Sequence, residues 1–149
     1  MNLQENIQRI KEMMGINESI KSYINSEMDE IERAVQDLTR DEDVDISVKE
    51  VKKKFNESEP KKLTKSIWDK LENTESNEIE KGDIKSVEKI AKKYNKTSPL
   101  RLEKSIRSGD YNPPLIIKFK NRYHLVAGNT RLCTSAALGI TPKVIIIEI

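Results

Sequence analysis

The chain has little of the chemistry on which many small proteins depend: its 149 residues include a single cysteine, Cys133, and a single histidine, His124. One cysteine excludes an internal disulfide, and one histidine beside one cysteine cannot form a Cys/His metal cluster. No apolar run approaches the length of a membrane span, and the polar amino terminus lacks the pattern of a signal peptide. These absences predict a cytoplasmic protein that has no metal site of its own and does not enter a membrane.

Aromatic residues are also scarce, at 5%, whereas charged residues make up 35% of the chain and apolar residues 36%. Much of the length must therefore be solvated helix surface. The charges are unevenly divided: residues 1–83 contain 14 basic and 21 acidic side chains, a net charge of −7, and residues 84–149 contain 13 and 4, a net charge of +9. The basic part suits a phosphate-bearing ligand or a nucleic acid, although lysine-rich helices often serve solubility alone.

The amino-terminal third is predicted to be helical because its apolar residues recur at helical spacing. Residues 3–14 form one short stripe that Gly15 ends, and Asn17 can cap a second helix that runs to residue 38. The stripe favours packing of one helix face on the rest of the protein; the alternative is a helical hairpin or a self-associating seam that makes a homo-oligomer. The acidic stretch 39–45 then predicts a boundary between a helical appendage, residues 1–43, and a domain, residues 44–149.

Residues 44–98 have weaker patterns. We expect a short edge strand at 44–48, lysine-rich helices at 48–55, 63–71 and 84–94, and a polar loop at 73–83. Trp68 is expected to anchor the core of this helical region. The helix at 84–94 has the apolar spacing of the first helix of a helix-turn-helix, which any amphipathic helix also shows. This spacing is one basis for a nucleic-acid-binding alternative.

The carboxyl-terminal part, residues 98–149, has the most regular pattern. Strands are predicted at 115–119, 123–127 and 143–149, and helices at 100–107 and 132–138. The continuous apolar run 144–147 indicates a strand that is buried on both faces. The predicted fold class is therefore α+β: a small mixed β-sheet with packed helices, preceded by an α-helical amino-terminal region.

The turn Gly128-Asn129-Thr130-Arg131, here called the 128–131 turn, joins the second of these strands to the following helix. A strand that passes through a glycine into a helix leaves backbone N–H groups unpaired at the helix start. Those groups and the helix dipole favour an anion such as phosphate. Arg131 adds a planar, permanently charged fork for phosphate oxygens. Asn129 or Thr130 is expected to cap the helix, which we expect to start at Arg131.

The segments Ser105-Ile106-Arg107, Pro113-Pro114-Leu115-Ile116 and Tyr123-His124-Leu125-Val126-Ala127-Gly128, with Arg131, resemble the core of the ParB/sulfiredoxin-like superfamily. The resemblance covers about a third of the chain. In that superfamily the Gly-x-x-Arg turn and the preceding helix hold the phosphates of a nucleotide, ATP in sulfiredoxins and CTP in ParB proteins.

For this chain, the resemblance implies that Gly128 permits close backbone approach and that Arg131 contacts phosphate. Ser105 stands where sulfiredoxins have a nucleotide-contacting threonine. Arg101, one turn earlier, replaces a serine of that family with a cation that could still meet a phosphate.

Other positions depart from the family. Asn129 stands where sulfiredoxins have their catalytic cysteine and Thr130 where they have a histidine, so the known sulfiredoxin reaction is excluded. ParB proteins commonly have Glu-Arg-Arg in this turn, where this chain has Asn-Thr-Arg, and a helical DNA-binding domain after the closing strand; because the sequence stops at Ile149, partition-complex function is not expected. Cys133 is interpreted as a buried, inert thiol, and His124 as a structural residue of a strand.

No catalytic group is identified, so an enzyme and a binding protein both stay open. A phosphotransferase or a nucleotidase would need a carboxylate to hold Mg²⁺. Glu103 and Asp110 flank the predicted phosphate helix, and Glu57, Glu59 or Asp83 could reach the site from the acidic part.

The amino terminus has a further resemblance. Residues 1–18 are similar to short leader segments of tailed-phage proteins, and Ile16-Asn17-Glu18 resembles the Ile/Leu-x-Glu site cut by prohead proteases of T4-like phages. This implies a phage protein, in the host cytoplasm or the virion, whose leader is removed. Three functions are therefore predicted: a nucleotide-binding protein, a nucleic-acid-binding or ParB-like nuclease module, and a phage structural protein with a degenerate site.

Overall fold

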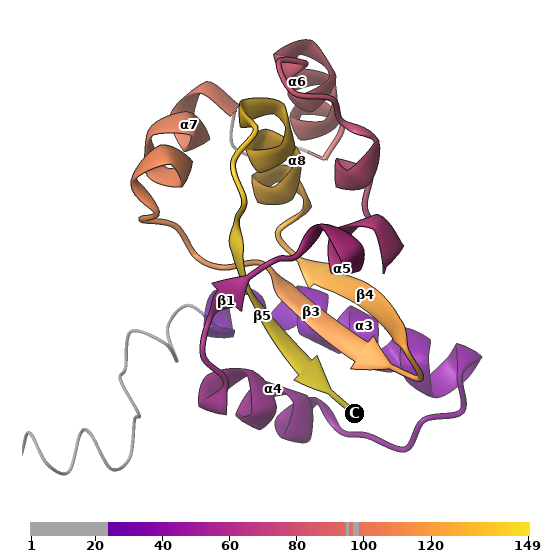
Figure 1. Cartoon of the computed structure of the whole chain (residues 1–149). Helices are drawn as coiled ribbons and strands as arrows, with labels where there is room; N and C mark the ends of the chain where they lie inside the picture. Colours follow the sequence, from indigo (N-terminus) through magenta and orange to yellow (C-terminus); the bar gives the residue numbers. More distant parts are fainter. Residues whose placement is uncertain (1–23, 95, 97–98) are drawn as a thin grey trace, which may run out of the picture. The chain divides into compact units, whose positions relative to one another are not determined.

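A computed structural model describes residues 24–94, 96 and 99–149 (Figure 1). The chain divides into two compact units, Met1–Ser58 and Glu59–Ile149. The first contains 9 basic and 14 acidic residues, a net charge of −5, and the second contains 18 and 11, a net charge of +7. We call them the acidic unit and the basic unit. The predicted phage-type leader and the first apolar stripe, at residues 3–14, lie outside the described residues.

In the acidic unit, helices α3 (Met28–Asp41) and α4 (Val48–Glu57) contact each other. α3 buries four apolar residues at helical spacing, and α4 buries Val51 and Phe55. The predicted strand at 44–48 is wrong, because residues 43–47 form a loop that leads into α4. Ser47 explains the difference: its hydroxyl oxygen accepts from the Glu50 N–H at 3.1 Å, an N-cap that starts a helix, and its hydroxyl donates to the Glu50 carboxylate at 3.2 Å.

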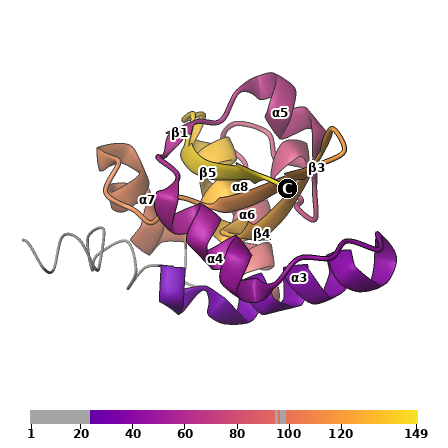
Figure 2. The same ribbon diagram turned by 90° about the horizontal axis from the view of Figure 1, so that it is seen from below.

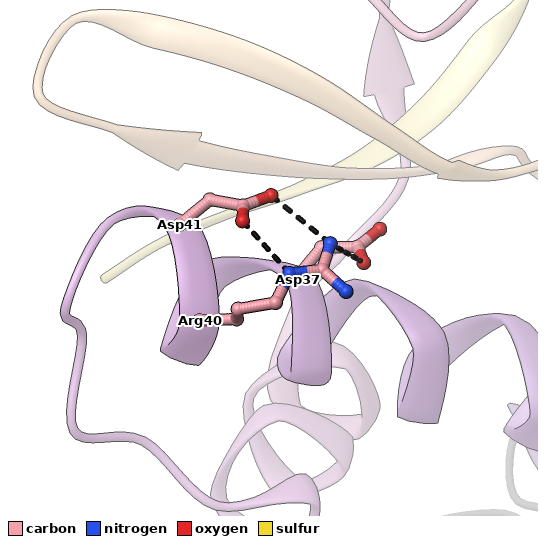
Figure 3. Close-up of polar contacts among 3 residues, drawn as sticks. All are labelled: Asp37, Arg40 and Asp41. Atoms are coloured by element: carbon pink, nitrogen blue, oxygen red, sulfur yellow. Dashed lines mark hydrogen bonds and ion pairs between the residues drawn. The ribbon is translucent and has the colours of Figure 1, made fainter.

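The carboxyl end of α3 carries a small exposed ion cluster (Figure 3). Arg40 Nε donates to Asp41 Oδ1 at 2.8 Å, and Arg40 Nη2 donates to Asp37 Oδ1 at 3.0 Å. The hydrogen bond with Asp41 raises the pKa of Arg40 and lowers the pKa of Asp41. Because these side chains are exposed, the cluster shapes the surface charge of the acidic unit more than its stability.

The basic unit is built on a five-stranded mixed sheet with the order β1-β5-β3-β4-β2. The strands are β1 (Lys61–Lys62), β2 (Leu71–Glu72), β3 (Leu115–Phe119), β4 (Arg122–Ala127) and β5 (Lys143–Glu148). β3 and β4 form an antiparallel hairpin, whose turn residues Lys120 and Asn121 both have left-handed backbones. β5 lies parallel to β3, and β2 lies parallel to β4. The three strands predicted in the carboxyl-terminal part are confirmed to within a residue.

One core of the basic unit forms around the sheet. Its buried members are Leu63, Leu71, Ile116, Leu125, Leu132 and Val144, and Trp68 packs against them. The helix predicted at 63–71 is shorter, because Thr64 caps α5 (Lys65–Lys70) and Leu71 already belongs to β2. Leu63 N–H donates to Pro142 O at 2.9 Å, which ties this segment to the residues before β5. Trp68 is therefore half-buried against the core of the sheet.

Helices α6 (Ile84–Lys93), α7 (Pro99–Ser108) and α8 (Asn129–Leu138) contact one another. Figure 1 shows α8 between α6 and α7, and in the view from below α7 again lies beside α8 (Figure 2). A second core joins Val87 of α6 to Cys133 and Ala137 of α8. Residues 73–83, predicted as a loop, include only one short 3₁₀ turn, η1 (Ser76–Glu78). Within the described part of the chain, no helix combines the length and apolarity that crossing a membrane requires.

Candidate functional site

The 128–131 turn leads from the end of β4 into α8, and Gly128 fixes its geometry. Gly128 has a left-handed backbone, with φ of 105°. A Cβ atom at this position would lie 2.6 Å from Pro114 Cβ and 2.9 Å from Pro114 Cα. Glycine is therefore required twice, by its backbone angle and by the close approach of Pro114. The close backbone approach that the sequence predicts for a ligand is made here to the residue that precedes β3.

Arg131 contacts the same segment. Its Nη1 donates to Asn112 O at 2.6 Å, and the side chain is half-buried. Gly128 and Arg131 thus both hold the segment of residues 112–114 against the start of α8. This bond places the guanidinium beside the first turn of the helix, where a cation can act together with the helix dipole on an anion.

The expected side-chain cap at this helix is wrong. α8 starts at Asn129 rather than at Arg131, its N-cap residue is Gly128, and no side chain caps it. The reason is the left-handed Gly128, which turns the chain into the helix earlier, so that Asn129 and Thr130 belong to the first turn. Leu132 N–H donates to Gly128 O at 3.0 Å, as the first regular helical bond requires. The N–H groups before it have no partner within the helix.

The Asn129 side chain does not cap α8; it belongs to a polar network instead. Asn129 Nδ2 donates to Glu75 Oε2 at 2.7 Å, and Asn129 Oδ1 accepts from the Thr74 hydroxyl at 2.7 Å. The Thr74 and Ser76 hydroxyl oxygens are 2.7 Å apart, and Trp68 Nε1 donates to the Ser76 hydroxyl at 2.8 Å. Because Thr74 has one hydroxyl proton and Asn129 Oδ1 has none, Ser76 must donate to Thr74. We call these five residues the Asn129 network.

Glu75 extends this network to the surface. Its second oxygen, Oε1, accepts from the Tyr94 hydroxyl at 3.2 Å. The carboxylate was not among those that the sequence suggested, because residues 73–83 read only as a polar loop. Its contact with Asn129 spans 54 positions of the chain, so no local pattern could have found it.

Cys133 lies one turn into α8 and is fully buried. Burial, and then the negative charge of Glu75, raise the pKa of its thiol to about 12. The predicted burial of Cys133 is confirmed, and with this pKa the thiol is protonated at neutral pH, as an unreactive thiol would be.

The other predicted site residues lie at different distances from the turn. Thr130 is buried, and its carbonyl accepts from the Thr134 hydroxyl at 2.8 Å. Arg101 is exposed and Ser105 half-buried on α7, which contacts α8. Among the residues that the structure describes, no hydrogen bond or ion pair joins Arg101 or Ser105 to the turn. Helix α7 contacts α8, but the described structure gives neither side chain a polar contact with the turn.

The opposite end of α8 carries a hollow that the sequence did not suggest. Its volume is 330 Å³, and it is lined by Lys81, Gly82, Ile84, Glu103, Arg107, Ala137 and Leu138. Gly82 N–H donates to Ala137 O at 2.6 Å, and Arg107 Nε donates to Glu103 Oε1 at 3.0 Å. Lys81 lies over the helix end, since a Cβ on Gly139 would meet its Cε at 2.7 Å. This place suits a lysine because the carboxyl end of a helix is negative.

Two further groups were considered from the sequence. His124 is half-buried in β4, opposite Ile117 of β3 and Glu72 of β2. Arg122, at the start of β4, forms a two-pronged bond with Glu72 at 3.0 and 2.9 Å, which lowers the Glu72 pKa. Over residues 24–94, 96 and 99–149, no group of three His, Cys, Asp or Glu side chains is placed to hold a metal ion.

Comparison with known proteins adds no relative: no protein-family model, no curated protein and no solved structure matches the chain.

Proposed function

We propose that the basic unit binds the phosphate of a nucleotide at the 128–131 turn. The observation that carries the proposal is the start of α8: the helix opens from a left-handed glycine and has no side-chain cap. The N–H groups of such a first turn and the positive end of the helix dipole form a site for an anion.

Two features of the basic unit support a phosphate in particular. Arg131 is held beside the first turn by its bond to Asn112 O, where a guanidinium can offer a planar pair of donors to phosphate oxygens. The unit as a whole has a net charge of +7, which raises the local concentration of anionic ligands. A mixed sheet in which β4 runs through this turn into α8 is also what the resemblance to the ParB/sulfiredoxin-like superfamily implies, and membership of that superfamily is part of the proposal.

The contribution of each predicted residue differs in kind. Asn129 and Thr130 would act through their backbone N–H groups, since the Asn129 side chain is bonded to Glu75 and Thr130 is buried. Gly128 shapes the turn, and Arg131 supplies charge. Arg101 and Ser105 would meet the ligand from α7, on the evidence of the resemblance alone.

Glu75 determines which form of the nucleotide suits the site. A carboxylate bonded to Asn129 repels a bare phosphate that approaches the same turn. A nucleotide that carries Mg²⁺ on its phosphates reduces this repulsion, so ATP or CTP with Mg²⁺ is the proposed ligand. The ion would arrive with the nucleotide, because the described residues do not form a three-ligand metal site.

The site favours binding over catalysis. A nucleophile or a general base is needed for most nucleotide chemistry, and the thiol nearest to the turn, Cys133, is protonated and buried. We therefore propose a nucleotide-binding module rather than a phosphotransferase or a nuclease. The phage structural function stays a prediction, since it depends on residues 1–18, outside the described part.

Calorimetric titration with ATP, ADP, CTP and GTP, with and without Mg²⁺, tests the proposal. Arg131→Ala should weaken binding by roughly tenfold or more, since a charge-assisted hydrogen bond contributes about 1.5–3 kcal/mol. Arg122→Ala is the matched control: it removes an arginine from the far end of β4 and should leave binding unchanged. Equal affinity of the two variants, or no binding of any nucleotide by the wild type, would show that the turn is a structural element only.

A further inference from the structure

The hollow at the carboxyl end of α8 has an apolar floor. Ile84, the first residue of α6, and Ala137 and Leu138, the last two residues of α8, line it. Ala137 is buried in the second core of the basic unit, and Ile84 packs against that core. The volume of 330 Å³ lies at the lower end of the range of about 300–1,000 Å³ that is typical of small-molecule sites. The hollow is therefore continuous with the packed core and has the size for a small ligand.

Three charged side chains also line the hollow: Lys81, Glu103 and Arg107. They give it two positive charges and one negative, a net charge of +1. Arg107 uses Nε to reach Glu103 Oε1 at 3.0 Å. Within the part of the chain that the structure describes, no polar contact uses Arg107 Nη1 and Nη2 or the Lys81 ammonium. Two cations from different segments thus keep donors for a ligand.

Both cationic side chains are held in place by contacts at their stems. The Lys81 stem lies along Gly139, where an added Cβ would be 2.7 Å from Lys81 Cε and 2.8 Å from Cδ. Arg107 is oriented by its Nε bond to Glu103, which leaves the terminal pair of nitrogens for a planar, two-oxygen acceptor. Because the stems are already ordered, little side-chain entropy is left to lose when an anion binds.

From the floor and the two cations together, we infer that the hollow binds a small carboxylic acid with an apolar body. The carboxylate accepts from the terminal nitrogens of Arg107 and from the Lys81 ammonium. The apolar body lies on Ile84 and Leu138, which are half-buried and are covered further by the ligand. A single negative charge balances the net charge of the hollow.

Two features favour a cationic ligand instead: the Glu103 carboxylate and the negative carboxyl end of α8. Each already has a positive neighbour, since Arg107 is bonded to Glu103 and Lys81 lies over the helix end. The inference is independent of the proposed nucleotide site. None of its residues belongs to the 128–131 turn, and the 10 residues of α8 separate the two sites by about 15 Å.

The ligand class is tested by protein NMR on the isotope-labelled full chain, titrated with hexanoate, hexanamide, hexylamine and acetate. Hexanoate should shift the amide signals of Gly82, Leu138 and Gly139 saturably, with the millimolar affinity of a ligand of its size. Hexanamide and hexylamine lack the negative charge, and acetate lacks the apolar body, so each should bind at least about tenfold more weakly. The Gly128 amide should not shift.

The residues are tested with the same hexanoate titration. Arg107→Gln should weaken binding by roughly tenfold, because it removes a charge-assisted pair of donors. Lys104→Gln is the matched control: it removes a positive charge from the exposed side of the same helix and should stay within about twofold of the wild type. Glu103→Gln removes the one negative charge and should tighten binding by about twofold or more.

Melting temperatures confirm that each variant is folded. The inference would be overturned by a lack of saturable hexanoate shifts at the hollow, or by hexylamine or hexanamide binding as tightly as hexanoate. Equal affinities of Arg107→Gln and Lys104→Gln, or weaker binding by a folded Glu103→Gln, would overturn it as well.

Discussion

The two ends of α8 differ in how their polar groups are satisfied. At the amino end, Gly128 packs on Pro114, Arg131 bonds to Asn112 O, and Asn129 is engaged with Thr74 and Glu75. At the carboxyl end, Gly139 closes the helix and a hollow of 330 Å³ remains between α8, α6 and α7. The amino end is the one that sequence patterns mark as a site, yet its side chains mostly serve the fold. What it offers to a ligand is its backbone and the charge of Arg131.

This contrast has a physical origin. A glycine turn into a helix demands a tight approach of neighbouring segments, and each tight approach buries polar groups that must then be paired. The Asn129 network is the result: a chain of hydrogen bonds in which every hydroxyl both donates and accepts. The carboxyl end needs no such network, because the backbone N–H of Gly139 donates to the carbonyl oxygens of Ala136 and Ser135. Experiments that compare the two ends of α8 therefore separate effects on packing and stability from effects on ligand binding.

The largest difference is expected in thiol reactivity. With a pKa of about 12, the Cys133 thiol has on the order of 1,000-fold less thiolate near pH 8 than an ordinary cysteine. Alkylation by iodoacetamide should be slower by at least this factor in the native protein than in urea. Leu138→Cys in a Cys133→Ser background is the comparison, since Leu138 lines the hollow at the other end and should react fast. Similar rates at the two positions would show that the amino end is open.

Glycine substitutions should have the next largest effect. Gly128→Val places side-chain atoms where Pro114 lies and forces a branched residue into a left-handed backbone, for a loss of about 2–5 kcal/mol of unfolding free energy. Gly139→Ala also meets a left-handed backbone, with φ of 70°, but the atoms in its way belong to the flexible Lys81 side chain. Its expected loss is about 1–2 kcal/mol. Urea unfolding monitored by Trp68 fluorescence measures both, and equal losses would contradict the role given to Pro114.

The extent to which the sequence predicts this architecture depends on the range of the interactions involved. β3, β4 and β5 follow from apolar runs and from glycine at the turns, which are local signals. The loop at residues 43–47 was mistaken for a strand because alternation of apolar residues competes with the capping signal of Ser47 and Glu50, and the cap prevails. Glu75 and Asn129 could not be paired in advance, since neither has a local feature that points to the other. The local pattern thus predicts the turn itself, but not the contacts that the Asn129 side chain makes there.

A third comparison is between two asparagines near the 128–131 turn: Asn129 bonds through its side chain, and Asn112 bonds to Arg131 through its backbone carbonyl. Asn129→Ala removes a donor from Glu75 and an acceptor from Thr74, so partly buried polar groups lose partners, at a cost of about 1–3 kcal/mol. Asn112→Ala leaves the carbonyl that Arg131 uses in place and removes only an exposed side chain, so its effect should stay within about 0.5 kcal/mol. Chemical denaturation at pH 7 measures both. If Asn112→Ala is as destabilising as Asn129→Ala, the network does not hold this end of the helix.

The smallest effect is expected at the opposite end of α8, where Asp83 caps α6 beside the hollow. The Ser86 hydroxyl donates to Asp83 Oδ2 at 2.6 Å and the Ser86 N–H donates to Oδ1 at 3.2 Å, and these bonds lower the Asp83 pKa in the folded protein. A carboxyl whose pKa is lowered by folding stabilises fully above its unfolded pKa, near 3.9, and the stabilisation is lost as the pH falls through the folded value.

Ser86→Ala keeps the Asp83 carboxylate and the backbone bond but removes the hydroxyl bond, which is the largest cause of the lowered Asp83 pKa. The difference in melting temperature between wild type and variant should therefore be small at pH 7 and shrink toward zero near pH 2. A difference that persists unchanged at pH 2 would mean that Ser86 acts through packing rather than through the charge of Asp83. Because Asp83 and Ser86 form no hydrogen bond with the 128–131 turn in the described part of the chain, the same variant should bind nucleotide as the wild type does. Altered nucleotide affinity in Ser86→Ala would place the ligand in the hollow at the carboxyl end of α8 instead of at its amino end.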